Sequence, residues 1–215
     1  MNYELVSIIG SVIIGYAIIA GIYNFKSLDK ASRILLFLML FTFIIESVAD
    51  YFIVKYNNSN VVYGLFNPIQ LLFIAAYYNY SIEGLKKSKI ALLIGGVGTM
   101  FGFVNYIWIQ TPFKMNNFFL LFESLIVIAL SLYAFYKMLL EDEQLVLTKY
   151  QHFWLTSIQL FFWTATFFIW GLYNYMTVTL GIGASIIHIV LLSVNVIYYV
   201  GMGTVFLMYN KMQIS

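Results

Sequence analysis

The sequence predicts an all-α fold, a polytopic membrane protein built as a bundle of seven transmembrane helices. Of its 215 residues, 62% are hydrophobic and only 9% are charged, whereas soluble domains carry roughly 25% charged residues. The apolar residues form seven runs of about 20 residues, the length that crosses a bilayer as a helix. The connections between the runs are short, so we expect one transmembrane domain over residues 1–215.

The runs are continuously apolar, which favours helices over the alternating strands of a membrane barrel. In chain order the predicted spans are Leu5–Tyr23, Ile34–Val54, Val61–Ile82, Ile90–Ile109, Asn117–Tyr136, Phe153–Asn174 and Ile182–Met208. The first is expected to remain as a span, because it lacks the basic start and the cleavage site of a signal peptide. The last exceeds the length that a bilayer requires and is expected either to tilt or to extend past the bilayer.

The first two spans differ in their polar content. The first contains no charged residue, whereas the second contains Glu46 and Asp50. These carboxylates are four residues apart and therefore share one face of a helix. A carboxylate within lipid is costly and usually faces a bundle interior or a water-filled cavity. We therefore expect this face of the second span to point into the bundle.

The third and fourth spans contain proline and glycine residues that affect helix geometry and packing. Pro68 lies in the third span beside Asn67 and Gln70, and a proline inside a helix removes a hydrogen bond. The sequence therefore predicts a helix kink at Pro68. In the fourth span, Gly98 and Gly102 form a G-x-x-x-G pair, which predicts close packing against another helix.

The last three spans each add a polar or aromatic candidate. Glu123 lies in the fifth, Trp163 and Trp170 in the sixth, and His188 in the seventh. The remaining polar residues of the other half of the bundle are few, chiefly Gln159, hydroxyls and tyrosines. This scarcity argues against an open channel.

The basic residues predict the orientation. One side of the membrane would hold Lys26, Lys30, Arg33, Lys86, Lys87, Lys89, Lys137, Lys149 and Lys211, and the other Lys55 and Lys114. Because Lys and Arg are enriched in cytoplasmic loops, the amino terminus is predicted outside and the carboxyl terminus in the cytoplasm. At about 1.5 Å of rise per residue, the intramembrane carboxylates and His188 then fall in the outer half.

These positions predict one ligand-binding or proton-coupling pocket that opens to the outside. Its expected lining is Glu46, Asp50, Asn67, Gln70, Glu123 and His188, with Trp163 and Trp170 as aromatic walls. Polar residues from several spans lie at one depth. A site shared by these residues is therefore a stronger interpretation than a role for any one of them alone.

An enzymatic function is the least favoured hypothesis. Ser185, His188 and Glu123 could form a hydrolase set, but no nucleophile motif supports it. A metal site from the same carboxylates and His188 would normally need more histidines, so we expect no catalytic residues, metal or cofactor. A retinal site is excluded because the last span has no lysine before Lys211, and the absence of a basic patch excludes nucleic acid.

The favoured function is a sensory or regulatory membrane protein, or an accessory subunit, that responds to a small ligand or a proton. Since no connection can hold a signalling domain, it would act through a protein partner or as a homo-oligomer in the lipid bilayer. The predicted contact surface is formed by the loops 24–33, 83–89 and 137–152. The alternative is a small-solute or proton-coupled transporter or channel.

Several short motifs support this architecture. They are Glu46 in the second span, NNSNVVYGLFNPIQLLF at 57–73, FLLFES at 119–124 and YQHFWLTSIQLFFW at 150–163. With these motifs the chain resembles an uncharacterised group of small seven-helix integral membrane proteins of Bacteroidetes. The resemblance implies a multi-pass protein of the bacterial inner membrane and implies no activity. Gln70 stands where the group's pattern has a glutamate, which weakens a strictly acidic role there.

Overall fold

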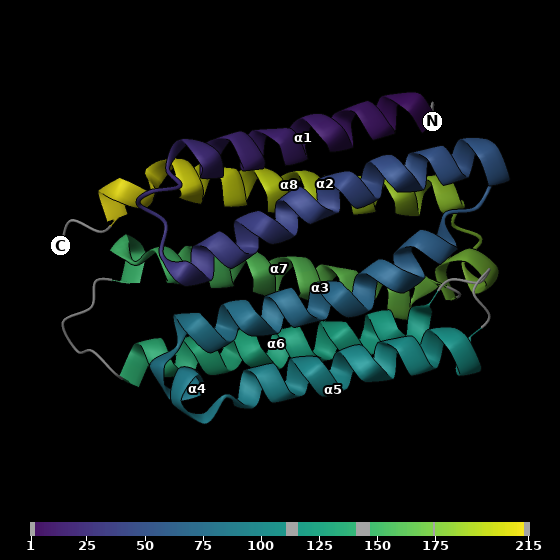
Figure 1. The fold of residues 1–215 in the computed structure, drawn as a ribbon. Helices are drawn as coiled ribbons and strands as arrows, with labels where there is room; N and C mark the ends of the chain where they lie inside the picture. The colour runs from purple at the N-terminus through teal and green to yellow at the C-terminus, as the bar shows by residue number, and fades with distance from the viewer. Residues whose placement is uncertain (1–2, 111–115, 141–146, 174, 213–215) are drawn as a thin grey trace.

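The computed structural model describes residues 3–110, 116–140, 147–173 and 175–212, and these residues form helices joined by short connections (Figure 1). The helices are α1 (Tyr3–Tyr23), α2 (Lys30–Tyr56), α3 (Asn60–Ser81), α4 (Glu83–Ser88), α5 (Ile90–Val104), α6 (Asn117–Leu140), α7 (Gln151–Gly171) and α8 (Ala184–Met212). Two π-helical turns, η1 (Asn105–Ile109) and η3 (Tyr175–Thr179), and one 3-10 turn, η2 (Leu147–Lys149), lie between them.

Seven helical segments of the described chain are long and apolar enough to cross a membrane. They are α1, α2, α3, α5 with its continuation η1, α6, α7 and α8. The prediction of an all-α fold with seven helices long and apolar enough to cross a membrane is thereby confirmed, while the direction in which the chain crosses the membrane stays a prediction. We call the end of the bundle where α1 begins the amino end, and the end where α8 finishes the carboxyl end (Figure 1).

The observed helices differ from the predicted spans mainly at their ends. Helix α2 begins at Lys30, four residues before the predicted start at Ile34, because Asp29 caps it. The Ser32 backbone N–H donates to Asp29 Oδ1 at 2.8 Å, which satisfies a donor that would otherwise lack a partner at a helix start. Apolarity marks only the part of a helix that lies in lipid, so the polar first turn escaped the prediction.

Six of the long helices form a closed ring. Helix α1 packs on α2, α2 on α3, α3 on α6, α6 on α7, α7 on α8, and α8 returns to α1. Helix α5 lies outside this ring against α3, and Figure 1 shows it at the edge of the bundle. A ring of six helices has an interior, and the content of that interior distinguishes the two ends of the bundle.

Helix α5 approaches α3 through its glycines. A Cβ added at Gly98 would lie 2.5 Å from Leu71 Cδ2, and one at Gly102 would lie 2.7 Å from Pro68 Cγ. These distances are too short for a side chain, so the predicted packing role of the G-x-x-x-G pair is confirmed. Pro68 lies inside α3, which continues as one helix; the kink predicted there stays a prediction.

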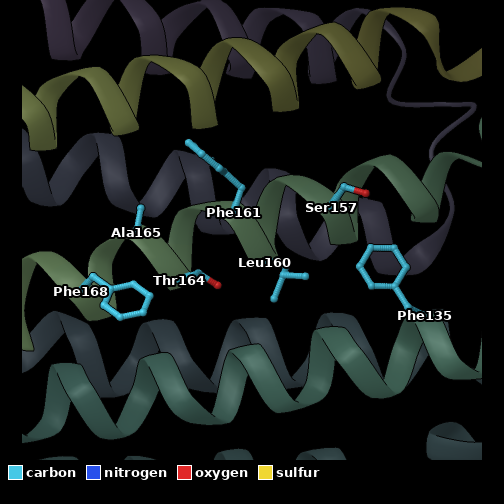
Figure 2. Close-up of a pocket in the computed structure, with 7 residues that line it drawn as sticks. All are labelled: Phe135, Ser157, Leu160, Phe161, Thr164, Ala165 and Phe168. Carbon is cyan, nitrogen blue, oxygen red and sulfur yellow. The ribbon is translucent and has the colours of Figure 1, made fainter.

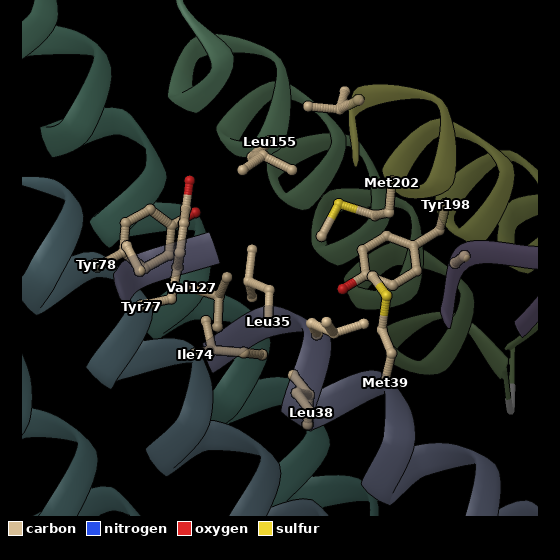
Figure 3. Close-up of a cluster of buried hydrophobic side chains, with 14 of the residues drawn as sticks. Leu35, Leu38, Met39, Ile74, Tyr77, Tyr78, Val127, Leu155, Tyr198 and Met202 are labelled. Carbon is tan, nitrogen blue, oxygen red and sulfur yellow. The ribbon is translucent and has the colours of Figure 1, made fainter. Parts of the chain in front are cut away.

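Toward the carboxyl end, the interior of the ring is filled with apolar side chains (Figure 3). Ten residues of this cluster come from α2, α3, α6, α7 and α8: Leu35, Leu38, Met39, Ile74, Tyr77, Tyr78, Val127, Leu155, Tyr198 and Met202. All of these side chains are buried. We refer to them as the packed core, and they close the bundle between its middle and its carboxyl end.

Candidate functional site

Toward the amino end, the interior of the ring contains a cavity of about 650 Å³. All six ring helices contribute to its lining, α6 through its first turns, and no residue of α5 lines it. Pockets for small molecules occupy roughly 300 to 1,000 Å³. The cavity is therefore large enough for a small organic molecule, and the packed core separates it from the carboxyl end.

Most of the residues predicted to form a pocket line this one cavity. They are Glu46, Asp50, Asn67, Gln70, Trp163, Trp170 and His188. Four helices that are distant in sequence supply them, so the tertiary structure gathers side chains that the sequence only placed at a similar depth. Their role in binding a ligand or a proton stays a prediction.

Hydroxyl groups hold the two carboxylates of α2. The Tyr63 hydroxyl of α3 donates to Glu46 Oε2 at 2.7 Å, and the Ser7 hydroxyl of α1 donates to an Asp50 oxygen. None of the described residues that line the cavity is Lys or Arg. The acidic face of α2 thus meets neutral donors on both neighbouring helices, and His188 is the lining side chain that can acquire positive charge.

Helix α7 supplies an aromatic wall that its own hydrogen bonds hold in place. The Trp163 indole Nε1 donates to Gln159 Oε1 at 3.0 Å, and Gln159 Nε2 donates to the Tyr198 hydroxyl at 3.0 Å. Trp163 is only 2% exposed. Because the indole has a fixed partner one turn away, its ring presents a rigid surface to the cavity.

The sequence interpretation missed several polar lining residues. Ser7, Tyr63, Thr166 and Tyr199 carry hydroxyls, which do not stand out in an apolar span, and Asn116 precedes the predicted start of the fifth span. Thr166 follows Trp163 by three residues and precedes Trp170 by four. That spacing on one helix face was the available signal for it.

Two of these residues have polar atoms without a hydrogen-bond partner among the described residues. Thr166 Oγ1 and Asn116 Nδ2 are both buried and unpaired. Their residues are 4% and 5% exposed. A buried donor or acceptor without a partner costs free energy. Both atoms are covered by protein, so they lie behind the surface of the cavity and do not face its open space.

Glu123 is the exception among the predicted residues, because it is not part of the cavity lining. It lies on the face of α6 that also buries Phe119 and Val127, one turn before and one turn after it, and all three are 0% exposed. Both Glu123 carboxyl oxygens lack a hydrogen-bond partner in the described part of the chain. Depth along a span had placed it with the pocket, whereas its rotation around α6 places it in the packed interior.

A polar face of α7 extends from the cavity toward the carboxyl end. It consists of His152, Thr156, Gln159, Trp163, Thr166 and Trp170, which follow one another at spacings of three and four residues. Such spacing aligns side chains along one side of a helix. The polar residues that the sequence showed as few and scattered are therefore aligned, and all but Trp170 are buried.

The carboxyl end of this face belongs to a second polar cluster around Asp29. His152 Nε2 lies 3.1 Å from Asp29 Oδ2, and the Tyr209 hydroxyl donates to Asp29 Oδ1 at 2.8 Å. His152 Nδ1 lies 3.4 Å from the Tyr77 hydroxyl. The cluster thus ties the starts of α2 and α7 to the ends of α3 and α8.

The charge of Asp29 is stabilised within this cluster. Burial favours its neutral form, but the hydrogen bond and the charge of His152, with hydrogen bonds from Ser32, outweigh burial. Together these interactions hold the pKa of the Asp29 carboxyl well below its usual value. Asp29 therefore remains ionised across the physiological range.

Neither enzymatic alternative gains support from the geometry. Among the described residues, no three His, Cys, Asp or Glu side chains lie close enough together to hold a metal ion. The alternative of a metal bound by Glu46, Asp50, Glu123 and His188 thus lacks a ligand cluster. The hydrolase alternative needs the Ser185 side chain, which lies outside the described residues.

A second hollow lies on the outside of α7 and has a different character. Phe135 of α6 and a run of α7 residues line it, with Phe161, Ala165 and Phe168 among them (Figure 2). It is open and almost entirely apolar. Its polar lining side chains are Ser157, whose hydroxyl donates to the Phe153 carbonyl, and Thr164. In a bilayer such a mostly apolar groove suits lipid chains.

Comparison with protein-family models, with curated proteins and with solved structures found no match. The resemblance to small seven-helix proteins of Bacteroidetes therefore stays a prediction.

Proposed function

We propose that this chain is a sensory or regulatory membrane protein that binds a small ligand in its cavity and acts through a protein partner. The observation that supports this best is the contrast within the ring of helices. An acidic, aromatic cavity occupies the amino end, and the packed core closes the carboxyl end. A blind cavity suits reversible binding better than continuous passage.

The orientation follows from the basic residues and belongs to the same proposal. Nine of the eleven Lys and Arg residues lie toward the carboxyl end, from Lys26 to Lys211. With that end in the cytoplasm of a bacterial inner membrane, the cavity opens toward the outside. The ligand would then be an extracellular or periplasmic molecule.

The partner would contact the carboxyl end. The connections between the spans are too short to hold a signalling domain, so the output needs a second protein or a second copy of this chain. Short helix α4 carries Lys86 and Lys87 in its last turn, and both are exposed. The polar face of α7 joins this end to the cavity, so a change at Trp163 can reach the Asp29 cluster along one helix.

The test is isolation of the tagged protein from its native membrane, with mass spectrometry of the proteins that remain bound. We expect a specific partner whose recovery changes in Gly10→Leu. Gly10 lines the cavity, and a Cβ there meets no atom within 4 Å, so leucine occupies the cavity without disturbing a neighbour. The matched control is Gly96→Leu on α5, which also has open space at Cβ but lies outside the cavity.

A small-solute or proton-coupled transporter is the second candidate, and the polar face of α7 favours it. This face gives a buried polar route past the packed core if the helices rearrange. Proteoliposomes that contain only this chain would then show solute or proton flux that Glu46→Gln abolishes. That result, without a need for any partner, would overturn the sensory proposal.

A further inference from the structure

We infer that the cavity is built for a small organic cation, an amine or a quaternary ammonium compound, held between the two α2 carboxylates and the aromatic walls. This inference rests on the proposal that the cavity is a ligand site and adds the chemical class of the ligand. Three observations support it: the charge of the lining, its aromatic surface and the volume of the cavity.

The charge of the lining is mainly acidic. Glu46 and Asp50 both line the cavity from α2, and His188 is the basic side chain among the described lining residues, which include no Lys or Arg. Each carboxylate receives a hydroxyl donor, from Tyr63 and Ser7. A carboxylate offers about four acceptor positions. A positively charged ligand would offset the cost of placing two carboxylates within a membrane.

The aromatic surface favours an organic cation over a metal ion. Trp163 and Trp170 of α7, Tyr63 of α3 and Tyr199 of α8 all line the cavity with the carboxylates. Aromatic faces attract ammonium groups and also pack against their alkyl substituents. A metal ion instead needs a close set of oxygen or nitrogen ligands, and the described residues provide no such group of acidic or histidine side chains.

The volume of the cavity indicates that the ligand is larger than a bare ammonium ion. The cavity holds about 650 Å³, which exceeds the need of a bare ammonium group. A compact organic molecule with a cationic group fits both the volume and the lining.

The experiment compares two probes that differ only in charge. Choline carries a quaternary nitrogen, and neohexanol is the uncharged alcohol with carbon in its place. Binding to the purified full-length protein in nanodiscs is measured by calorimetry and by the fluorescence of its tryptophans. We expect choline to bind at least about tenfold more tightly than neohexanol, since the carboxylates contribute to the first and not to the second.

The variants Glu46→Gln and Asp50→Asn identify the groups responsible. Each should weaken choline binding by at least about tenfold while leaving neohexanol binding unchanged. Glu83→Gln is the matched control, because Glu83 is exposed on α4 and outside the cavity. Thermal unfolding of each variant without a probe shows whether it is folded.

Three outcomes would overturn the inference. Equal binding of choline and neohexanol, or unchanged choline binding in both carboxylate variants, would leave a ligand cavity that is not selective for cations. Stabilisation by sodium ions or protons alone, with neither organic probe bound, would make the cavity an ion site. The sensory proposal is tested by a different experiment, since it fails if the chain shows flux without a partner. That result would not affect the inference that the ligand is a cation.

Discussion

The two halves of the bundle contain acidic side chains in opposite settings. At the carboxyl end, Asp29 is held by His152, Tyr209 and the backbone of Ser32, and its neighbours are closely packed. At the amino end, Glu46 and Asp50 receive hydroxyl donors and face a cavity. Acidic residues in this apolar chain thus occupy two different settings. The Asp29 site is filled by partners from the protein itself, whereas Glu46 and Asp50 border open space.

The sharpest way to test this contrast is to enlarge a glycine in each half. Gly203 lies where α8 meets α1, and a Cβ there would lie 2.5 Å from the Tyr16 ring and 3.1 Å from Ala17 Cα. Gly203→Leu should therefore separate the two helices and destabilise the protein by about 3 kcal/mol. Gly10→Leu, on the cavity side of α1, should cost less than about 1 kcal/mol, because the open space accepts the side chain.

Thermal unfolding in detergent micelles measures both variants against the unmodified protein. Equal loss of stability in the two would show that the cavity is as tightly packed as the carboxyl end, and the comparison would fail.

The second prediction removes one acidic side chain from each half. Asp29→Ala deletes the cap of α2 and leaves His152 and Tyr209 without their acceptor, which should cost about 2 kcal/mol. Glu46→Ala breaks one hydroxyl contact and removes a carboxylate from an apolar setting. Its net effect on stability should be smaller, within about 1 kcal/mol.

Denaturant or heat titrations of the two alanine variants provide the measurement, with Glu83→Ala on the exposed face of α4 as the control. A Glu46→Ala variant that is less stable than Asp29→Ala would mean that the cavity carboxylate, too, is structural.

The third prediction concerns acid. The folded-state pKa of Asp29 is lowered, so its contribution to stability is present above the unfolded-state pKa of about 3.9 and is lost as the pH falls below it. Unfolding temperatures measured from neutral pH down to about pH 3 should fall more steeply for the unmodified protein than for Asp29→Asn. Asparagine retains the capping oxygen but does not titrate, and parallel curves would show that the Asp29–His152 pair adds no charge-dependent stability.

The smallest expected effect comes from Thr166→Val. Valine has nearly the same shape as threonine and lacks the unpaired hydroxyl, so the empty protein should be unchanged or more stable by up to about 1 kcal/mol. Thr156→Val on the same face of α7 is the control, because the Thr156 hydroxyl lies 3.4 Å from that of Tyr77 and should be missed. A loss of stability in Thr166→Val equal to that of Thr156→Val would show that the Thr166 hydroxyl has a partner after all.

The membrane architecture could be predicted because lipid imposes a simple rule. Every backbone polar group in the bilayer must find a partner within its own helix, so runs of about 20 apolar residues correspond directly to spans. The ends of the helices were harder to predict from the sequence, as the capped start of α2 at Lys30 shows. Short helix α4 and the π-helical turn at 175–179 were also missed, since they lie between the spans, where the apolar signal fades. The π-helical turn at 105–109 lies within the predicted fourth span, where apolarity does not distinguish a π-helical turn from an α-helix.

The sequence predicted how deep each candidate residue lies along its span. It did not predict in which direction each side chain points around its helix. Counting residues along each span placed Glu46, Asn67, His188 and Glu123 at a similar level. Whether a side chain faces the cavity depends on which neighbours its helix packs against, and one residue of helix corresponds to roughly 100° of rotation. Glu123 was therefore grouped with the others and lies instead in the packed interior.

The amino-acid sequence by itself determined that the chain has seven helices long and apolar enough to cross a membrane and that carboxylates lie within them, because both facts follow from local composition. Only the tertiary structure decided that six helices close into a ring, that α5 stays outside it, and that one end of the ring is hollow while the other is filled. The physical reason is that a cavity is a property of the space between helices. Small and large side chains from distant spans set that space together, and no single span encodes it.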